Sequence, residues 1–157
     1  MIIPFESIKS WRAQLKEEGR SLVCTNGCFD ILHIGHLRYL RAAASLGDIL
    51  LVGLNDDQGI KELKGPERPI NTQSDRAELL SALEMVDVVT VFKGARAIDF
   101  LAASSPDIYV KGGDYQIEDL YQPEVEVLRQ CETQIKILPL IPGKSTTAML
   151  EAMKDIS

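Results

Sequence analysis

The sequence has few of the residues that mark disulfide-stabilised or membrane-spanning proteins. It contains three cysteines in 157 residues, so they cannot all pair within the chain, and only 6% of its residues are aromatic. Its longest apolar run, Ile49 to Leu54, is far below the roughly 18 residues that a membrane-spanning helix needs. We therefore expect Cys24, Cys28 and Cys131 to be free thiols.

The chain also lacks an excess of positive charge. Its 17 Lys and Arg residues against 23 Asp and Glu residues give a formal net charge of −6, whereas nucleic-acid-binding domains usually carry a basic stripe. We therefore expect no nucleic-acid partner, and any polyanion must be bound by a local group of cations. Pro4, Glu6 and Lys9 interrupt the start of the chain where a signal peptide would be apolar, so we expect a cytoplasmic protein with no membrane partner.

What the sequence does contain is an alternation of apolar runs and helical periods that is typical of α/β proteins. The run Ile49 to Leu54 is apolar on both faces, as in a central parallel strand covered by helices. The alternation predicts a Rossmann-like open parallel five-stranded sheet with helices on both faces, in a single domain over residues 1–157 whose helical segment 1–20 packs on it. The expected strands are residues 21–25, 49–54, 85–92, 107–110 and 134–138.

One stretch at the end of the first expected strand contains both histidines of the chain. Residues 25–36 have the pattern of a strand end, a turn and a helix start. His33 and His36 lie three residues apart, so they share one face at a helix N-terminus, where unpaired N–H groups attract phosphate. Two other interpretations stay open, namely an ordinary helix start with surface histidines and half of a metal site.

Three further segments fall at or just beyond strand ends, where doubly wound sheets bind ligands. They are the loop at Lys64, the glycine-rich segment Lys111 to Asp114, and the segment Gly143 to Thr147. The chain has no G-x-G-x-x-G turn followed by an acidic residue, so we expect no nicotinamide or flavin dinucleotide. The CxxxC spacing of Cys24 and Cys28 is also poor support for zinc, and no protein metal site is expected.

Gly27-x-Phe29-Asp30 followed by His33-Ile34-Gly35-His36 resembles the HxGH signature of the cytidylyltransferase-like nucleotidyltransferases, which join an NTP to a phosphorylated small molecule and release pyrophosphate. With Leu63-Lys64-Gly65, Lys111-Gly112-Gly113-Asp114-Tyr115 and Ser145-Thr146-Thr147 added, the chain most resembles the heptose 1-phosphate adenylyltransferases of bacterial lipopolysaccharide-precursor synthesis. Ile34 and Lys144 stand where members commonly carry a small residue and a cysteine. The resemblance implies a stand-alone form of a domain that is often fused to a sugar kinase.

The resemblance also implies an activity and a site. AMP would pass from ATP, bound with Mg²⁺, to a heptose 1-phosphate, giving ADP-heptose and pyrophosphate. A homodimer is the assembly that is common among relatives. His33, His36 and Lys64 would be catalytic, and Asp30 would order its loop or approach the sugar phosphate. Nucleotide and phosphate binding would fall to Asn26, Gly27, Cys28, Phe29, Gly35, Arg76, Lys111, Gly112, Gly113, Asp114, Ser145, Thr146 and Thr147.

Within that set, Arg76 and the Lys111 to Asp114 loop carry more specific expectations. Arg76 would be a surface residue that clamps phosphate from a helix start, with a surface ion pair as the alternative, and the loop would read the base or the ribose. Two other functions stay open: CTP-dependent transfer to glycerol 3-phosphate or another phosphorylated alcohol, and a non-catalytic nucleotide-binding regulator. Base preference separates the first from adenylyl transfer, and turnover separates the second.

Overall fold

The computed structural model describes residues 1–139 and 142–154. Its sheet consists of the parallel strands β1 (Leu22–Gly27), β2 (Ile49–Asn55), β3 (Val88–Phe92), β4 (Ile108–Gly112) and β5 (Gln134–Leu138), in the order β3-β2-β1-β4-β5. Strands β2 and β3 follow one another on one side of β1, and the chain then crosses back so that β4 and β5 lie on the other side of β1. This reversal leaves a crevice at the carboxyl ends of β1 and β4. The predicted Rossmann-like parallel sheet is confirmed.

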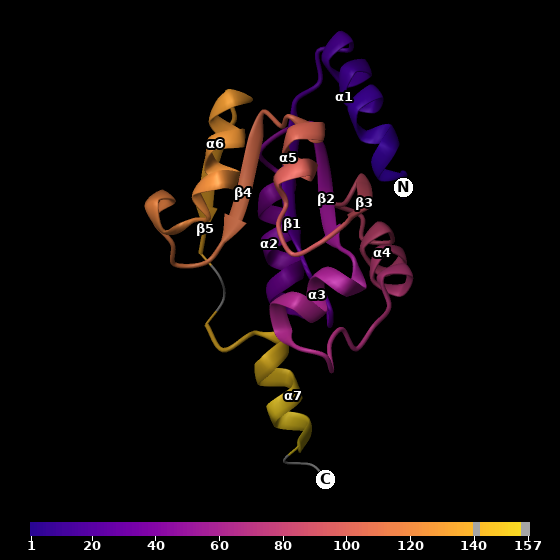
Figure 1. Ribbon diagram of the computed structural model, residues 1–157, viewed down its shortest axis with the longest axis vertical. Helices are drawn as coiled ribbons and strands as arrows, with labels where there is room; N and C mark the ends of the chain where they lie inside the picture. Colours follow the sequence, from indigo (N-terminus) through magenta and orange to yellow (C-terminus); the bar gives the residue numbers. More distant parts are fainter. Residues whose placement is uncertain (140–141, 155–157) are drawn as a thin grey trace.

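Helices cover both faces of the sheet (Figure 1). The helices on one face are α1 (Ile8–Glu17), α5 (Ile98–Ser104) and α6 (Gln122–Gln130), and those on the other are α2 (Ile34–Ala44) and α4 (Gln73–Ser81). Helix α3 (Asp57–Lys64) lies at the carboxyl end of the strands, and α7 (Thr146–Lys154) extends away from the sheet. Two 3₁₀ turns, η1 (Phe5–Ser7) and η2 (Ile117–Asp119), complete the elements. In the described ranges no helix has the length and apolar character to cross a bilayer.

Each face of the sheet packs its own hydrophobic core. Ile8, Phe100 and Leu128 belong to the core under α1, α5 and α6, and Leu40 and Leu80 belong to the core under α2 and α4. Every residue of β2 is buried, as its uninterrupted apolar run predicts. Since apolar burial is the main favourable contribution to folding, the two cores hold the carboxyl ends of the strands in fixed positions.

The third strand begins three residues later than its apolar run predicts. Residue 85 was the expected start, but Val86 N donates to Leu83 O at 2.9 Å in the turn after α4, and β3 begins at Val88. The carboxylate of Asp87 accepts a hydrogen bond from Leu50 N at 2.8 Å. Asp87 N also donates to Leu50 O at 3.2 Å, so the residues before Val88 close a turn and join β2 through Asp87 before the strand begins. An apolar pattern does not distinguish such a turn from strand pairing.

Candidate active site

The site opens where β1 and β4 separate. The two strands pair only from Val23 to Ile108 and from Cys24 to Tyr109, although β1 continues to Gly27. Two tyrosine hydroxyls bridge the gap beyond that point. Tyr39 of α2 donates to Val110 O at 2.9 Å and lies 2.7 Å from Thr25 Oγ1, while Tyr109 donates to Asn26 Oδ1 at 2.6 Å. The tyrosines thus hold the crevice open at the end of the central strand.

His33 and His36 lie at the start of α2 with their rings stacked. The ring centroids are 3.9 Å apart, and the ring planes differ by 27°. His33 is the N-cap of the helix, and its Nδ1 accepts a hydrogen bond from Gly35 N at 3.1 Å. Because Nδ1 is the acceptor, Nε2 of the neutral His33 ring carries the hydrogen and can donate to a ligand.

Two glycines of the motif make room for these aromatic rings. A Cβ at Gly35 would lie 2.8 Å from Nδ1 of His33, so a side chain there would displace the ring. A Cβ at Gly27 would lie 3.0 Å from the ring of Phe29, whose backbone has a left-handed φ of 45°. The Phe29 ring in turn lies 5.2 Å from that of His36, centroid to centroid. The spacing of the motif therefore follows from ring packing at the helix start.

The histidines lie in a locally positive environment in spite of the negative net charge. Burial, followed by the charges of His33 and Lys64, lowers the pKa of His36 to about 4. Burial and the charge of Lys144 lower the pKa of His33. Nδ1 of His36 is buried and has no hydrogen-bond partner within residues 1–139 and 142–154. Both rings are therefore neutral at pH 7, with Lys144 acting on His33 and Lys64 on His36, which suits donation to an anionic ligand.

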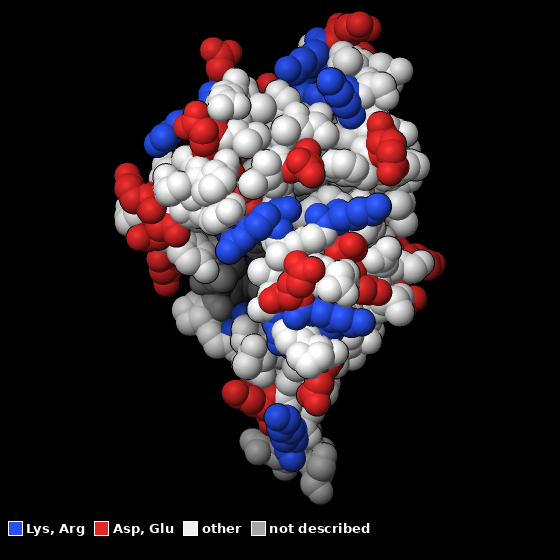
Figure 2. All heavy atoms as spheres, viewed as in Figure 1, with Lys and Arg blue, Asp and Glu red and all other residues white. Residues whose placement is uncertain are grey.

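A cavity of about 220 Å³ lies beside His36, and we call it the histidine cavity. It contains ten of the residues that the sequence assigned to the site: Asn26, Gly27, Cys28, Phe29, Asp30, His36, Lys64, Lys111, Gly112 and Thr146. Tyr39 also lines it. Figure 2 shows the surface hollowed here, below the end of β4 and beside α3, with Lys and Arg side chains at the rim. The structure thus brings together segments separated by 120 residues of sequence.

The remaining predicted residues lie around this cavity. His33 lines a neighbouring cavity with Lys144 and with Ala148, Met149 and Ala152 of α7. Ser145 Oγ accepts from Ala148 N at 3.1 Å, so its hydroxyl caps α7. Thr147 lies in the first turn of α7, Gly113 is buried, and Asp114 is exposed after β4.

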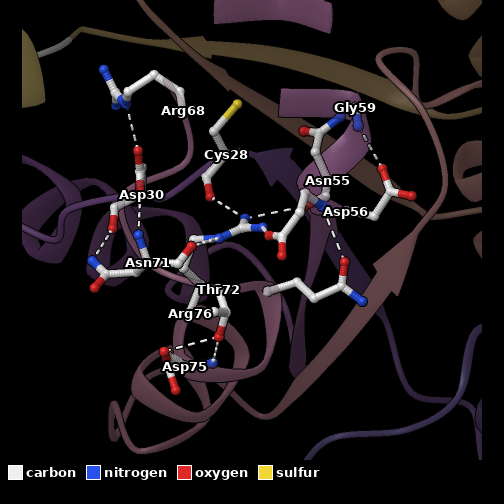
Figure 3. A network of polar contacts seen from close by, with 12 residues as sticks. Cys28, Asp30, Asn55, Asp56, Gly59, Arg68, Asn71, Thr72, Asp75 and Arg76 are labelled. Carbon is white, nitrogen blue, oxygen red and sulfur yellow. Dashed lines mark hydrogen bonds and ion pairs between the residues drawn. The ribbon is translucent and has the colours of Figure 1, made fainter. Parts of the chain in front are cut away.

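The expectation that Arg76 is a surface residue is wrong. Its side chain is fully buried, and its Nη1 donates to Cys28 O at 2.7 Å and to Asn55 O at 3.0 Å (Figure 3). Its Nε donates to Asn71 O at 3.0 Å, and its Nη2 pairs with the Asp57 carboxylate at 2.7 Å. The guanidinium therefore joins the loop after β1 to the end of β2 and the start of α4. A phosphate clamp would need the guanidinium N–H groups to face the histidine cavity, but Arg76 does not line that cavity and its N–H groups are bonded to protein.

Asp30 also has protein partners at both of its oxygens. Its carboxylate accepts from Arg68 Nε at 2.7 Å, from Ile70 N at 2.9 Å and from Asn71 N at 3.0 Å (Figure 3). Burial alone would raise the pKa of this carboxyl, but the hydrogen bonds from Asn71, Ile70 and Arg68 outweigh it and lower the pKa. Of the two expected roles, these contacts support loop ordering. Both carboxylate oxygens have protein partners, although Asp30 also lines the histidine cavity, and its assignment to sugar-phosphate binding stays a prediction.

A second cavity, of about 170 Å³, lies on the other side of Lys111, and we call it the tyrosine cavity. Its lining residues are Arg96, Tyr109, Lys111, Tyr115, Asp119, Leu120, Tyr121, Glu124, Val125 and Leu128. Lys111 lines both cavities, so the two spaces adjoin at the end of β4. The sequence reasoning missed most of these residues. A usable signal was present, since three of the four tyrosines fall between residues 109 and 121 in a chain poor in aromatic residues.

Comparisons with known proteins agree with this geometry. Residues 24–157 match the family model described as cytidylyltransferase-like. The chain is 43% identical over 151 residues to "Bifunctional protein HldE" of a Nitratiruptor species, and 45% identical over 153 residues to the protein of that name from Helicobacter hepaticus. These alignments cover 96% and 98% of this chain but 31% and 30% of the relatives. The chain thus spans about three tenths of the length of these curated relatives.

Solved structures give the same answer for the fold. The lipopolysaccharide core biosynthesis protein from Thermoplasma volcanium superposes with a TM-score of 0.63 at 28% identity, covering 78% of this chain and 98% of that one. Pantoate-beta-alanine ligase from Francisella tularensis superposes with a TM-score of 0.60 over 98% of this chain and 77% of that one, and at 14% identity it shows the fold alone. The family expected from the HxGH signature is confirmed, and the chain belongs to the cytidylyltransferase-like family.

Proposed function

We propose that this protein transfers AMP from ATP to the phosphate of a heptose 1-phosphate, giving an ADP-sugar and pyrophosphate, in the cytoplasm. The observation that carries the proposal is the stacked pair of neutral histidines at a helix N-terminus, of which His36 lines a cavity together with Lys64 and Lys111. Such an arrangement stabilises negative charge that develops on phosphate oxygens. The similarity to proteins named HldE supports transfer to a sugar phosphate.

The reaction needs no covalent intermediate with the enzyme. An oxygen of the acceptor phosphate forms a bond to the α-phosphorus of ATP, while the bond from that phosphorus to the bridging oxygen of pyrophosphate breaks. The leaving oxygen takes the electron pair, and no proton has to be transferred at the reacting phosphates. The protein therefore acts by holding the two substrates in line and by stabilising charge on the α-phosphate and the leaving group.

The chain has residues for each of these tasks. His33 and His36 would donate to the phosphates through ring N–H groups, and Lys64 at the end of α3 would neutralise the leaving pyrophosphate. Thr146 lines the histidine cavity at the first turn of α7, where backbone N–H groups can receive phosphate together with those of Ser145 and Thr147. Gly27 and Gly112 would allow the nucleotide to approach the backbone at the ends of β1 and β4.

Magnesium is proposed to enter with the nucleotide as part of the substrate. Within residues 1–139 and 142–154 there is no group of three His, Cys, Asp or Glu side chains that could hold a metal ion, and Asp30 is already paired with Arg68. Mg²⁺ is usually bound by nucleotide phosphates with few protein ligands. This donor set fits a metal carried by ATP better than one resident in the protein.

The proposal is tested by pyrophosphate release with each of the four NTPs, using D-glycero-β-D-manno-heptose 1-phosphate and glycerol 3-phosphate as acceptors. We expect ATP with the heptose phosphate to be preferred, because a site that hydrogen-bonds one base edge leaves polar groups unpaired when another base enters. That penalty is about 1–3 kcal/mol per unpaired group. Preference for CTP with glycerol 3-phosphate would contradict the proposal in favour of a cytidylyltransferase. No release with any pair would favour a non-catalytic regulator.

A further inference from the structure

Helices α2 and α4 leave large aliphatic side chains exposed on the face of the sheet that they cover. Ile34 at the start of α2 is 42% exposed, and Leu79 of α4 is 51% exposed. Three or four residues further along the chain, Leu37 and Leu83 are half-buried. Side chains at this spacing lie on the same side of a helical turn, so each of the two segments presents a short apolar stripe to solvent.

A cavity of about 250 Å³ lies within this apolar surface. Its lining residues are Leu32, His33, Ile34, Leu37 and Leu83. Four of the five are aliphatic, and a cavity of that kind offers water few hydrogen-bond partners, so an apolar side chain is a better occupant. Leu79 of the same chain is not among the lining residues. The surface therefore has both an exposed leucine and a cavity of the kind that accepts one.

The two helices carry opposite charges beside these apolar residues. The exposed charged residues of α2 are the basic Arg38 and Arg41, and those of α4 are the acidic Asp75 and Glu78. Across the described parts of the chain, the side chains of Arg38, Arg41 and Glu78 make no hydrogen bond or ion pair, and Asp75 accepts from the Thr72 hydroxyl. The charge of α2 is thus complementary to that of α4 and not to its own.

This distribution of charge fits a second copy of the same chain. In a dimer with a two-fold axis, each contact occurs twice with the roles of the two copies exchanged. A surface with charges of one sign would therefore repel its own copy. A surface with one basic and one acidic helix attracts its own copy when α2 of one faces α4 of the other, and such complementarity fixes the orientation of the two partners.

We propose that the α2–α4 surface, defined by Ile34, Arg38, Arg41, Glu78 and Leu79, is the interface of a two-fold symmetric homodimer. In each of the two equivalent contacts, the arginines of one copy face Glu78 of the other, and Leu79 of one copy enters the apolar cavity of the other. The inference does not rest on the proposed function. Since His33 lines the same cavity, the interface also covers one side of the helix start that carries the histidines.

Sedimentation velocity of the purified chain, at concentrations from about 1 to about 100 μM, measures the Kd of the dimer directly. We expect the wild-type chain to associate as a dimer in this range. Leu79→Ala should raise the Kd about tenfold or more, because the apolar contact with the cavity is lost. Leu79 is exposed in the single chain, so its circular dichroism spectrum and thermal unfolding should stay unchanged.

Charge reversal tests which helices face each other. The variant Arg38→Glu/Arg41→Glu and the variant Glu78→Lys should each raise the Kd of self-association about tenfold or more, because both equivalent contacts then join like charges. An equimolar mixture of the two variants should associate more tightly than either alone. In that mixed dimer one contact joins the reversed α2 to the reversed α4, and the other contact is the native pairing.

Arg129→Glu is the matched control, because it reverses an exposed cation of α6 on the opposite face of the sheet and should leave the Kd within about twofold. A wild-type chain that remains monomeric throughout the concentration range would overturn the proposal and leave the surface to a partner of another kind. A dimer that the α2 and α4 variants do not weaken would place the interface elsewhere. A mixture that associates no better than its two components would exclude the pairing of α2 with α4.

Discussion

The two sides of β1 differ in how their polar groups are satisfied. On the side toward β2, the buried charged residues Asp30 and Arg76 have protein partners, and Asn55 donates to Gly94 O at 2.9 Å. On the side toward β4, the cations Lys111 and Arg96 have no hydrogen-bond or ion-pair partner within the described residues. Buried polar groups with partners make a rigid scaffold, whereas cations without partners are ready for a ligand.

This difference separates two regions at the carboxyl end of β1, one that holds the backbone in place and one that leaves cations unpaired. The closed network fixes the backbone of Cys28 and Asp30, and with it the approach to the histidines at the start of α2. On the open side, between β4 and α6, Arg96 and Lys111 have no such partner within the described residues. Variants on the closed side should therefore lower stability, and variants on the open side should lower affinity.

The largest effect is expected from Arg76→Met, which keeps the length of the side chain and removes its donors. Three backbone carbonyls and the Asp57 carboxylate, whose side chain is 35% exposed, lose this donor. A buried acceptor left unpaired costs about 1–3 kcal/mol. Urea denaturation should show this loss in the free energy of unfolding. Lys64→Ala is the control, because this exposed residue should change stability by less than about 0.5 kcal/mol while lowering activity. Weak ATP binding with normal stability in Arg76→Met would return this arginine to phosphate binding.

The second-largest effect is a loss of kcat, and it is expected at the histidines, which lie between the two regions. His33→Ala and His36→Ala should each lower kcat at least about a hundredfold, because a donor aimed at developing charge acts most strongly in the transition state. The Kd for α,β-methylene-ATP should change much less. Stopped assays of pyrophosphate release under saturating substrates provide the measurement. Near-normal kcat in both variants would remove the histidines from catalysis and leave them as a helix start.

The sequence was sufficient for features that depend on local pattern. The buried strand at residues 49–54 and the pair at His33 and His36 follow from apolar runs and helical spacing. Such features need only neighbours along the chain, so composition and spacing predict them well.

The features that could not be predicted depend on contacts between distant segments. Arg76 reaches Cys28, which lies 48 residues earlier, and whether an arginine at a helix start faces solvent or carbonyls is decided by that packing. The stack of Arg96 on Tyr121 likewise joins the segment before α5 to the start of α6. Asp30 was left with two roles because only the fold of the loop at residues 68–71 shows that both of its oxygens are taken.

The smallest of the three expected effects concerns Asp30→Asn, which keeps the shape of the side chain but removes its charge. The variant weakens the ion pair with Arg68 and the bonds from two backbone amides, a loss of about 2 kcal/mol for hydrogen bonds to a charged group. Since folding lowers the pKa of this carboxyl, its contribution is complete above the unfolded pKa of about 3.9 and is lost as the pH falls through the lower folded pKa.

The pH dependence of that difference distinguishes a charged contact from simple packing. The gap in unfolding free energy between wild type and Asp30→Asn should be constant from about pH 7 to pH 5 and should shrink below about pH 4. Asp99→Asn is the matched control, because this exposed acid makes no side-chain hydrogen bond or ion pair within the described residues, and its gap should stay below about 0.5 kcal/mol throughout. A gap for Asp30→Asn that persists unchanged to pH 2 would mean that the amide disrupts packing, and that the carboxylate charge does not hold the loop.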